Sequence, residues 1–168
     1  MRYVLPDGTA IRIRPIAADD KTKLVNGLRQ LSLESIRKRF LAAKPRFTAS
    51  ELRYLTEVDG VNHIALVAVL DDWPEQLVAV ARCVRLPDRP DTAEMAIVVG
   101  DPFQGQGVGR AITNALADAA IEAGIRRFAA TMAGDNVAAR RLMQTFERRL
   151  DEAYVGSGLR EVLVDLTA

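Results

Sequence analysis

Hydrophobic and polar positions follow two different periods along this chain, and the changes of period predict where strands and helices lie. Residues 9–14 alternate apolar with basic side chains and predict a first strand, which Pro15 ends. Three apolar runs, at 63–70, 76–84 and 92–99, predict further strands, and the short links between them predict an antiparallel meander. From 108 to 123 the apolar positions share one face of an amphipathic helix.

Capping signals place more helices between the first strand and the meander. A helix is expected from an N-cap at Asp19 to about residue 31, a second opens at Ser32, and a capping box at Thr48 and Glu51 begins a short third. After the amphipathic helix, which Gly124 ends, we expect a strand at 127–131, a helix at 136–149 and a final hairpin at 154–166. The expected fold class is α/β (α+β), as one domain over residues 1–168.

A glycine-rich stretch at 101–114 joins the meander to the amphipathic helix. Gly105, Gly107 and Gly109 leave the backbone free of Cβ atoms, so a charged ligand can approach the main chain closely. Unpaired N–H groups and the positive end of the helix dipole converge there, which predicts a phosphate site. The spacing fits neither the G-x-G-x-x-G dinucleotide motif nor a Walker loop, since no glycine here is followed by lysine.

Composition limits the classes of partner. The 168 residues carry 23 basic and 22 acidic side chains, a net charge of +1, so we expect neither a nucleic-acid nor a membrane partner. The N-terminus lacks the apolar region of a signal peptide, and the only cysteine, Cys83, suits a reducing compartment, so we expect a cytoplasmic protein. The only histidine, His63, excludes a multi-histidine metal site, and no metal is expected.

Gln104, Gly107 and Gly109 fit the pattern Gln/Arg-x-x-Gly-x-Gly/Ala, which resembles the pyrophosphate loop of the GNAT superfamily of acetyl-CoA-dependent N-acyltransferases. The resemblance implies acetyl-CoA as co-substrate and the GNAT fold, a mixed and mostly antiparallel central sheet of about six to seven strands flanked by helices. The resemblance covers residues 3 to about 146. In four segments, 7–16, 31–40, 55–59 and 64–68, the sequence is similar to the catalytic domain of bacterial (Pat-type) protein lysine acetyltransferases.

That resemblance implies a protein lysine as the acceptor. Such domains are often fused to a cyclic-nucleotide-binding or acyl-CoA-synthetase-like domain, and we expect that regulation to be absent here or supplied by another chain.

The resemblance also implies contacts between the cofactor and three segments of the chain. The main chain of the strand would pair with the pantetheine amides, and an N–H there could polarise the thioester carbonyl. The expected cofactor-binding residues are Ile97, Val98, Val99, Gln104, Gly105, Gln106, Gly107, Val108, Gly109, Arg110, Asn136 and Ala139. Two alternatives stay open: Asn136 could be only a helix N-cap, and Arg110 could be only a solvated side chain.

Glu94 is the expected catalytic base. An amine acceptor is protonated at neutral pH and must lose a proton before it attacks a thioester. Glu94 begins an otherwise apolar strand that leads into the glycine loop, where partial burial would tune it for proton transfer, and the resemblance places the general base of lysine acetyltransferases at this position. The competing interpretation is an exposed glutamate at a strand end.

Two positions depart from the superfamily pattern. Asn136, Ala139 and Leu142 match Asn-x-x-Ala-x-x-Leu-Tyr, but Met143 replaces the tyrosine that reprotonates the leaving thiolate, and Tyr154 is the substitute to be tested. Downstream, residues 147–148 read Glu-Arg where relatives have Gly-Phe. The alternatives are therefore an acetyltransferase for a small amine and a non-catalytic acyl-CoA sensor. Acyl preference and oligomeric state, monomer or homodimer, stay open.

Overall fold

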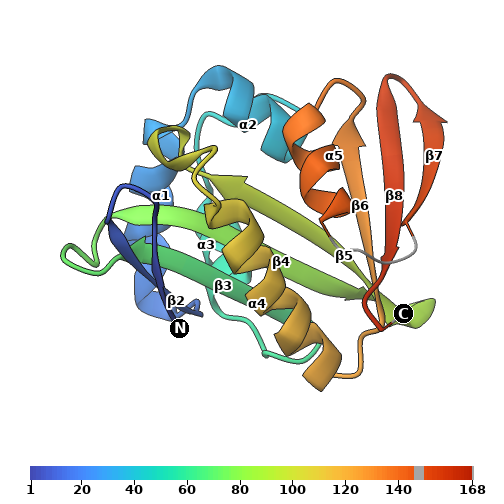
Figure 1. Ribbon diagram of the computed structural model, residues 1–168, viewed down its shortest axis with the longest axis horizontal. Coiled ribbons are helices and arrows are strands. Elements are labelled where there is room, and N and C mark those ends of the chain that lie inside the picture. The colour runs from blue at the N-terminus through green and yellow to red at the C-terminus, as the bar shows by residue number, and fades with distance from the viewer. Residues whose placement is uncertain (146–149, 168) are drawn as a thin grey trace.

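The computed structural model describes residues 1–145 and 150–167, which form an eight-stranded sheet with helices on both faces (Figure 1). Every neighbouring pair of strands is antiparallel except β5 and β6, so the sheet is mixed as expected. The strands, in their order across the sheet, are β1 (Arg2–Val4), β2 (Ala10–Pro15), β3 (His63–Leu70), β4 (Leu77–Leu86), β5 (Arg89–Val99), β6 (Arg127–Ala133), β8 (Leu159–Asp165) and β7 (Leu150–Gly156).

The structure confirms the fold class and the meander of β3, β4 and β5, but it adds one strand to the range expected. Strand β1 is three residues long, too short for a hydrophobic period to reveal it. Strands β4 and β5 extend further toward each other than their apolar runs, whereas β3 has the bounds expected. Leu86 pairs with Arg89, so residues 86–90 hold the ends of two strands joined by a two-residue turn.

The described helices are α1 (Lys21–Gln30), α2 (Leu33–Phe40), α3 (Ala49–Thr56), α4 (Val108–Glu122) and α5 (Val137–Gln144). The predicted caps of α2 and α3 are confirmed: the Ser32 side chain accepts the N–H of Ser35, and Thr48 forms a reciprocal capping box with Glu51. The predicted end of α4 at Gly124 is also confirmed, because this glycine has a φ of +81°.

The predicted N-cap at Asp19 is wrong. Helix α1 begins at Lys21 after a 3-10 turn over Ala18–Asp20, and the Asp20 side chain caps no helix N–H. Its carboxylate accepts two hydrogen bonds from Arg14, at 2.7 and 2.8 Å, and one from the N–H of Ala17. The helix predicted at 136–149 is described only as far as residue 145, and residues 146–148, where the sequence departs from Gly-Phe, lie outside the described residues.

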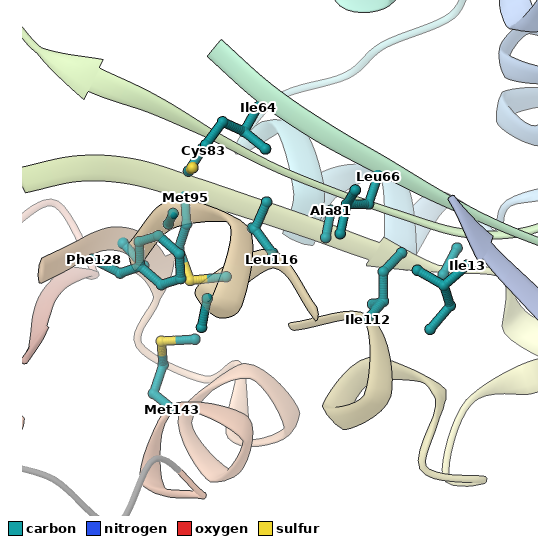
Figure 2. Close-up of a cluster of buried hydrophobic side chains, with 14 of the residues drawn as sticks. Ile13, Ile64, Leu66, Ala81, Cys83, Met95, Ile112, Leu116, Phe128 and Met143 are labelled. Carbon is teal, nitrogen blue, oxygen red and sulfur yellow. The ribbon is translucent and has the colours of Figure 1, made fainter. Parts of the chain in front are cut away.

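The core lies mainly between the sheet and α4, which crosses in front of it in Figure 1. Ile112 and Leu116 of α4 are fully buried there, against Cys83 and Met95 from the strands (Figure 2). A smaller cluster packs α1 and α3 on the opposite face of β3 and β4. Because α4 is fixed along its whole length, its N-terminus is held beside the end of β5. No described helix is long and apolar enough to cross a membrane.

Candidate active site

The site begins where strands β5 and β6 part. These two parallel strands pair only from Thr92 to Glu94 on β5, and Glu94 opposite Ala129 is the last pair. Beyond that point β5 continues to Val99 while still paired with β4, and the two strands diverge in Figure 1. Within the described residues, the edge of β5 from Met95 onward therefore has no partner strand on this side, which leaves main-chain groups for an extended ligand.

The glycine loop closes one end of this open edge. Gly105 and Gly107 have φ values of +73° and +84°, which side-chain-bearing residues rarely adopt, and Gly107 is the N-cap of α4. A Cβ atom on Gly109 would lie 3.7 Å from Val99 and 3.9 Å from Ile97, which are ordinary contact distances, so the first turn of α4 lies directly beside β5. The unpaired N–H groups of the first turn of α4 converge on this point.

A cleft of about 650 Å³ runs from the loop along the open edge of β5 and between α2 and α5. Its lining includes the predicted residues Ile97, Val98, Val99, Gln104, Gly105, Gly107, Gly109, Arg110, Asn136 and Ala139. Two predicted contacts do not line it. Val108 is fully buried in the core, which leaves only its main chain available, and the Gln106 side chain donates to the carbonyl of Pro102 at 2.8 Å.

Two predicted side chains have structural partners as well. Asn136 is the N-cap of α5 and accepts the N–H of Ala139 at 3.1 Å, so the capping interpretation holds, while its position in the cleft leaves room for a ligand contact. Gln104 donates to the carbonyl of Val99 at 3.0 Å and to the hydroxyl of Ser35 at 3.2 Å. The Val99 carbonyl already has a donor, and the N–H of Gly100 donates to Val78 of β4, so by alternation the main-chain groups of Val98 face β4 and those of Ile97 face the open edge.

One carboxylate ties α2 to the loop. Asp101 accepts the N–H of Ser32 at 2.9 Å, the Ser32 hydroxyl at 2.9 Å and the Ser35 hydroxyl at 2.8 Å. Burial alone would raise the pKa of Asp101, but these hydrogen bonds outweigh it and lower the pKa below its ordinary value. The network fixes the N-terminus of α2 against the wall of the cleft.

The cleft is positively charged. Lys38, Arg39, Arg110 and Arg141 line it, and of these only Lys38 has an ion-pair partner among the described residues, namely Glu34. A phosphorylated ligand would meet these cations and the N-terminus of α4 together. No cluster of three or more His, Cys, Asp or Glu side chains in the described part of the chain is arranged to hold a metal ion.

Residues 31–147 match the family model of the acetyltransferase (GNAT) family. The chain belongs to the GNAT acetyltransferase family. It is therefore an acetyltransferase of a family that uses acetyl-CoA, and the open edge of β5 and the glycine loop are where that family's cofactor is expected.

Its relatives include Pat-type proteins. The acetyltransferase Pat of Mycolicibacterium smegmatis is 32% identical over 154 residues, which are 92% of this chain and 44% of the relative, so the chain spans less than half of that protein. The GNAT domain of S. lividans PAT superposes with a TM-score of 0.89 at 31% sequence identity, over 98% of this chain and 96% of that domain. A cAMP-binding acyltransferase from Mycobacterium smegmatis superposes with a TM-score of 0.66 at 27% sequence identity. The match covers 100% of this chain and 47% of that one.

Glu94 does not line the GNAT cleft; it is the last residue before β5 and β6 part, three residues before Ile97, where the lining of the cleft on β5 begins. Alternation along β5 puts Glu94 on the same face as Val98, which packs with α1 and α3, and opposite Met95, which enters the core. The Glu94 side chain is exposed, so the partial burial expected from its apolar neighbours is absent. It also lies inside β5 and not at its start, because that strand begins at Arg89.

Neither Met143, which replaces the family's proton donor, nor Tyr154, the suggested substitute, lines this GNAT cleft. Met143, at the position of the family tyrosine, is 3% exposed and points into the core beside Phe128 and Met95 (Figure 2). Tyr154 is exposed on β7, the edge strand beyond β6 and β8, and its hydroxyl accepts the N–H of Gly158. The suggestion that Tyr154 serves as the acid is therefore wrong, because three strand spacings separate its strand from β5.

Several cleft residues were not predicted from the sequence, among them Ser32, Ser35, Asp101 and Arg141. Asp101 meets the two serines across more than 60 positions of sequence, so no local pattern links them. The basic run at 37–39 was a usable signal, because its members Lys38 and Arg39 both line the cleft.

Proposed function

We propose that this chain transfers the acetyl group of acetyl-CoA to the side-chain amine of a protein lysine, with both substrates bound at once and Glu94 as general base. The observation that carries the proposal is the position of Glu94. The cleft follows β5 from Val99 back to Ile97, and Glu94 lies three residues further along the same strand, where β5 and β6 part.

The cofactor would bind from its phosphates inward. Main-chain N–H groups from Gly105 to Arg110 and the N-terminus of α4 would hold the pyrophosphate, with Arg110, Arg141 and Lys38 neutralising charge. The pantetheine arm would then lie along the open edge of β5, where its amides can pair with the main chain of Ile97 as an added strand would. In this pose the thioester would lie toward Glu94.

The transfer needs two protons to leave the nitrogen and one bond to be exchanged. Glu94 would accept the first proton from the lysine ammonium, directly or through water, and the neutral nitrogen would attack the thioester carbonyl carbon. The C–N bond forms as the C–S bond breaks, coenzyme A leaves as the thiolate, and the nitrogen releases its second proton to water to give the neutral amide. Because position 143 holds a methionine, the thiolate would leave without a proton from that side chain; a thiol of ordinary pKa near 8.5 makes this tolerable.

Direct attack is favoured over a covalent acyl-enzyme. Cys83 is the only cysteine in the chain, and it is fully buried in the core between the sheet and α4. Burial raises the pKa of the Cys83 thiol to about 12, so almost no thiolate is present at neutral pH. The chain therefore offers no accessible thiolate on which an acetyl-cysteine intermediate could form.

The test is transfer of labelled acetyl from acetyl-CoA to a bacterial lysate, resolved into protein and small-molecule fractions, with Glu94→Gln alongside. We expect label on protein lysines with the native chain and almost none with the variant. Label confined to small molecules would instead assign a small-amine acceptor. Intact acetyl-CoA binding with no transfer to either fraction would assign a non-catalytic sensor.

A further inference from the structure

Within the described part of the chain, two arginine side chains near Glu94, those of Arg39 and Arg82, have no carboxylate partner; Arg82 lies opposite Ala96, so it shares a face of the sheet with Glu94. Arg39, on the last turn of α2, lines the cleft, and apart from stacking on Phe40 it makes no hydrogen bond or ion pair within the described residues. Burial lowers the pKa of Arg39, and the charge of Glu94 opposes that shift, so its guanidinium is desolvated and within electrostatic reach of the base.

Arg82, on β4, is the second of these cations and is 6% exposed. Its Nη1 atom lies 3.2 Å from the Leu55 carbonyl and 3.1 Å from Nε2 of His63, and its Nε is buried with no hydrogen-bond partner among the described residues. Burial and the nearby charge of Arg39 lower the pKa of Arg82 to about 10. A buried guanidinium without a counter-ion is costly, which makes it a marker of function more than of stability.

The charges that face this space come from five elements. Arg39 on α2 and Arg82 on β4 are positive, Glu94 on β5 is negative, and Tyr54 on α3 is neutral. His63 on β3 is also neutral, because burial and Arg82 lower its pKa, against the weaker effect of Asp59, and because its Nε2 can only accept from an arginine. The net charge of the cluster is therefore +1 beside the position where a positive lysine must arrive.

We propose that Arg39, backed by Arg82, binds a carboxylate of the acceptor, so that the enzyme selects lysines with an aspartate or glutamate beside them. The proposal rests on the function assigned above and deepens it. The acceptor's ammonium pairs with Glu94 while its carboxylate pairs with Arg39, and the two charges of the acceptor complement those of the site. An isolated lysine would meet two guanidinium groups with only one carboxylate to offset them.

Arg39 makes the contact and Arg82 sets the local charge. Arg39 lines the open cleft, whereas the Nε of Arg82 is inaccessible and one of its Nη atoms already has partners. Arg82 would keep the space positive and so favour an anionic group beside Arg39. The planar guanidinium of Arg39 suits a carboxylate, which it can bind with two parallel hydrogen bonds.

The test uses a synthetic pool of short peptides, each with one lysine and randomised flanking residues, acetylated by the whole chain and sequenced after capture of the acetylated products. The native chain is compared with Arg39→Gln. The matched control is Arg37→Gln, which removes the same charge from the same helix, because Arg37 is largely exposed, pairs with Asp135 at 3.2 Å and does not line the cleft.

We expect acidic residues to be enriched beside the modified lysine by about tenfold, the effect of one charge-assisted contact of roughly 1.4 kcal/mol. Arg39→Gln should abolish the enrichment even if it also slows transfer, since the readout is a ratio, while Arg37→Gln should keep it. Arg39→Lys should keep part of it. Acetylation without acidic enrichment, or an enrichment that survives in Arg39→Gln, would overturn this inference alone; no lysine acetylation of any peptide or protein would overturn the proposed function with it.

Discussion

The bond network around Asp101 makes a quantitative prediction about how α2 shapes the cofactor site. In Asp101→Asn the side chain keeps its size but loses its charge, and one oxygen becomes an NH₂ group. That group would face the Ser32 N–H, so one hydrogen bond is lost and the two from the serine hydroxyls are weakened. The N-terminus of α2 should then detach from the loop more often.

The magnitude follows from the three bonds and the partial exposure of the carboxylate. Loss of a partner for a buried polar group costs about 1–3 kcal/mol, and water can replace part of this at Asp101, so we expect about 1–2 kcal/mol. Local opening of α2 should become roughly 5–30 times more frequent. If acetyl-CoA binds only when α2 is docked, its affinity falls by at most the same factor.

Hydrogen exchange of a peptide that covers α2, together with calorimetric titration of acetyl-CoA, measures both effects. Asp135→Asn is the matched control, because it also removes a carboxylate that contacts α2, but through an exposed ion pair with Arg37 that should contribute little. Exchange in α2 and cofactor affinity that are the same in Asp101→Asn and Asp135→Asn would refute the reasoning.

The remaining predictions concern the cleft wall and a buried ion pair. Gly109→Leu should weaken acetyl-CoA binding by tenfold or more in calorimetry, because the leucine side chain would occupy the space between Ile97 and Leu142. Gly109→Ala should bind acetyl-CoA normally, because its Cβ atom lies at ordinary contact distances. Tight binding by the leucine variant would contradict this prediction. Asp20→Asn should cost about 3 kcal/mol in urea unfolding at neutral pH, since Asp20 is fully buried and pairs with Arg14. Burial would raise the pKa of Asp20, but Arg14 and the other donors lower it to about 2. The stability that ionised Asp20 contributes is therefore present above pH ~4 and is lost as the pH falls toward 2. A difference in unfolding free energy between the variant and the native chain that does not narrow over this range would contradict the role given to Asp20.

The sequence predicted the parts of the site that depend on local order. The glycines of the loop, the helix that follows them and the cap at Asn136 are short-range features, and the structure brings most of them to one cleft. The exposure of Glu94 was misjudged for a local reason. Its neighbours are apolar, but alternation sends Met95 to the core and Glu94 to the other face, where no described side chain covers it.

What the sequence could not predict depends on pairing between distant segments. The parting of β5 and β6 after Glu94 creates the cleft, and it follows from the register of two strands more than 30 residues apart. The bonds from Asp101 to Ser32 and the approach of Arg39 to Glu94 likewise join segments that only the folded sheet brings together. The buried Met143 could be read as a missing acid, but its place in the core could not.

The most direct test of the account is the effect of Glu94→Gln on turnover, measured beside the dissociation constant of acetyl-CoA in the same preparation. If Glu94 is the general base, turnover should fall by roughly 10²-fold or more while the dissociation constant stays the same, because the cofactor cleft lies along β5 and the loop. Glu122→Gln, an exposed glutamate at the far end of α4, should leave both unchanged. Full turnover in Glu94→Gln would remove this residue from the mechanism and contradict the account.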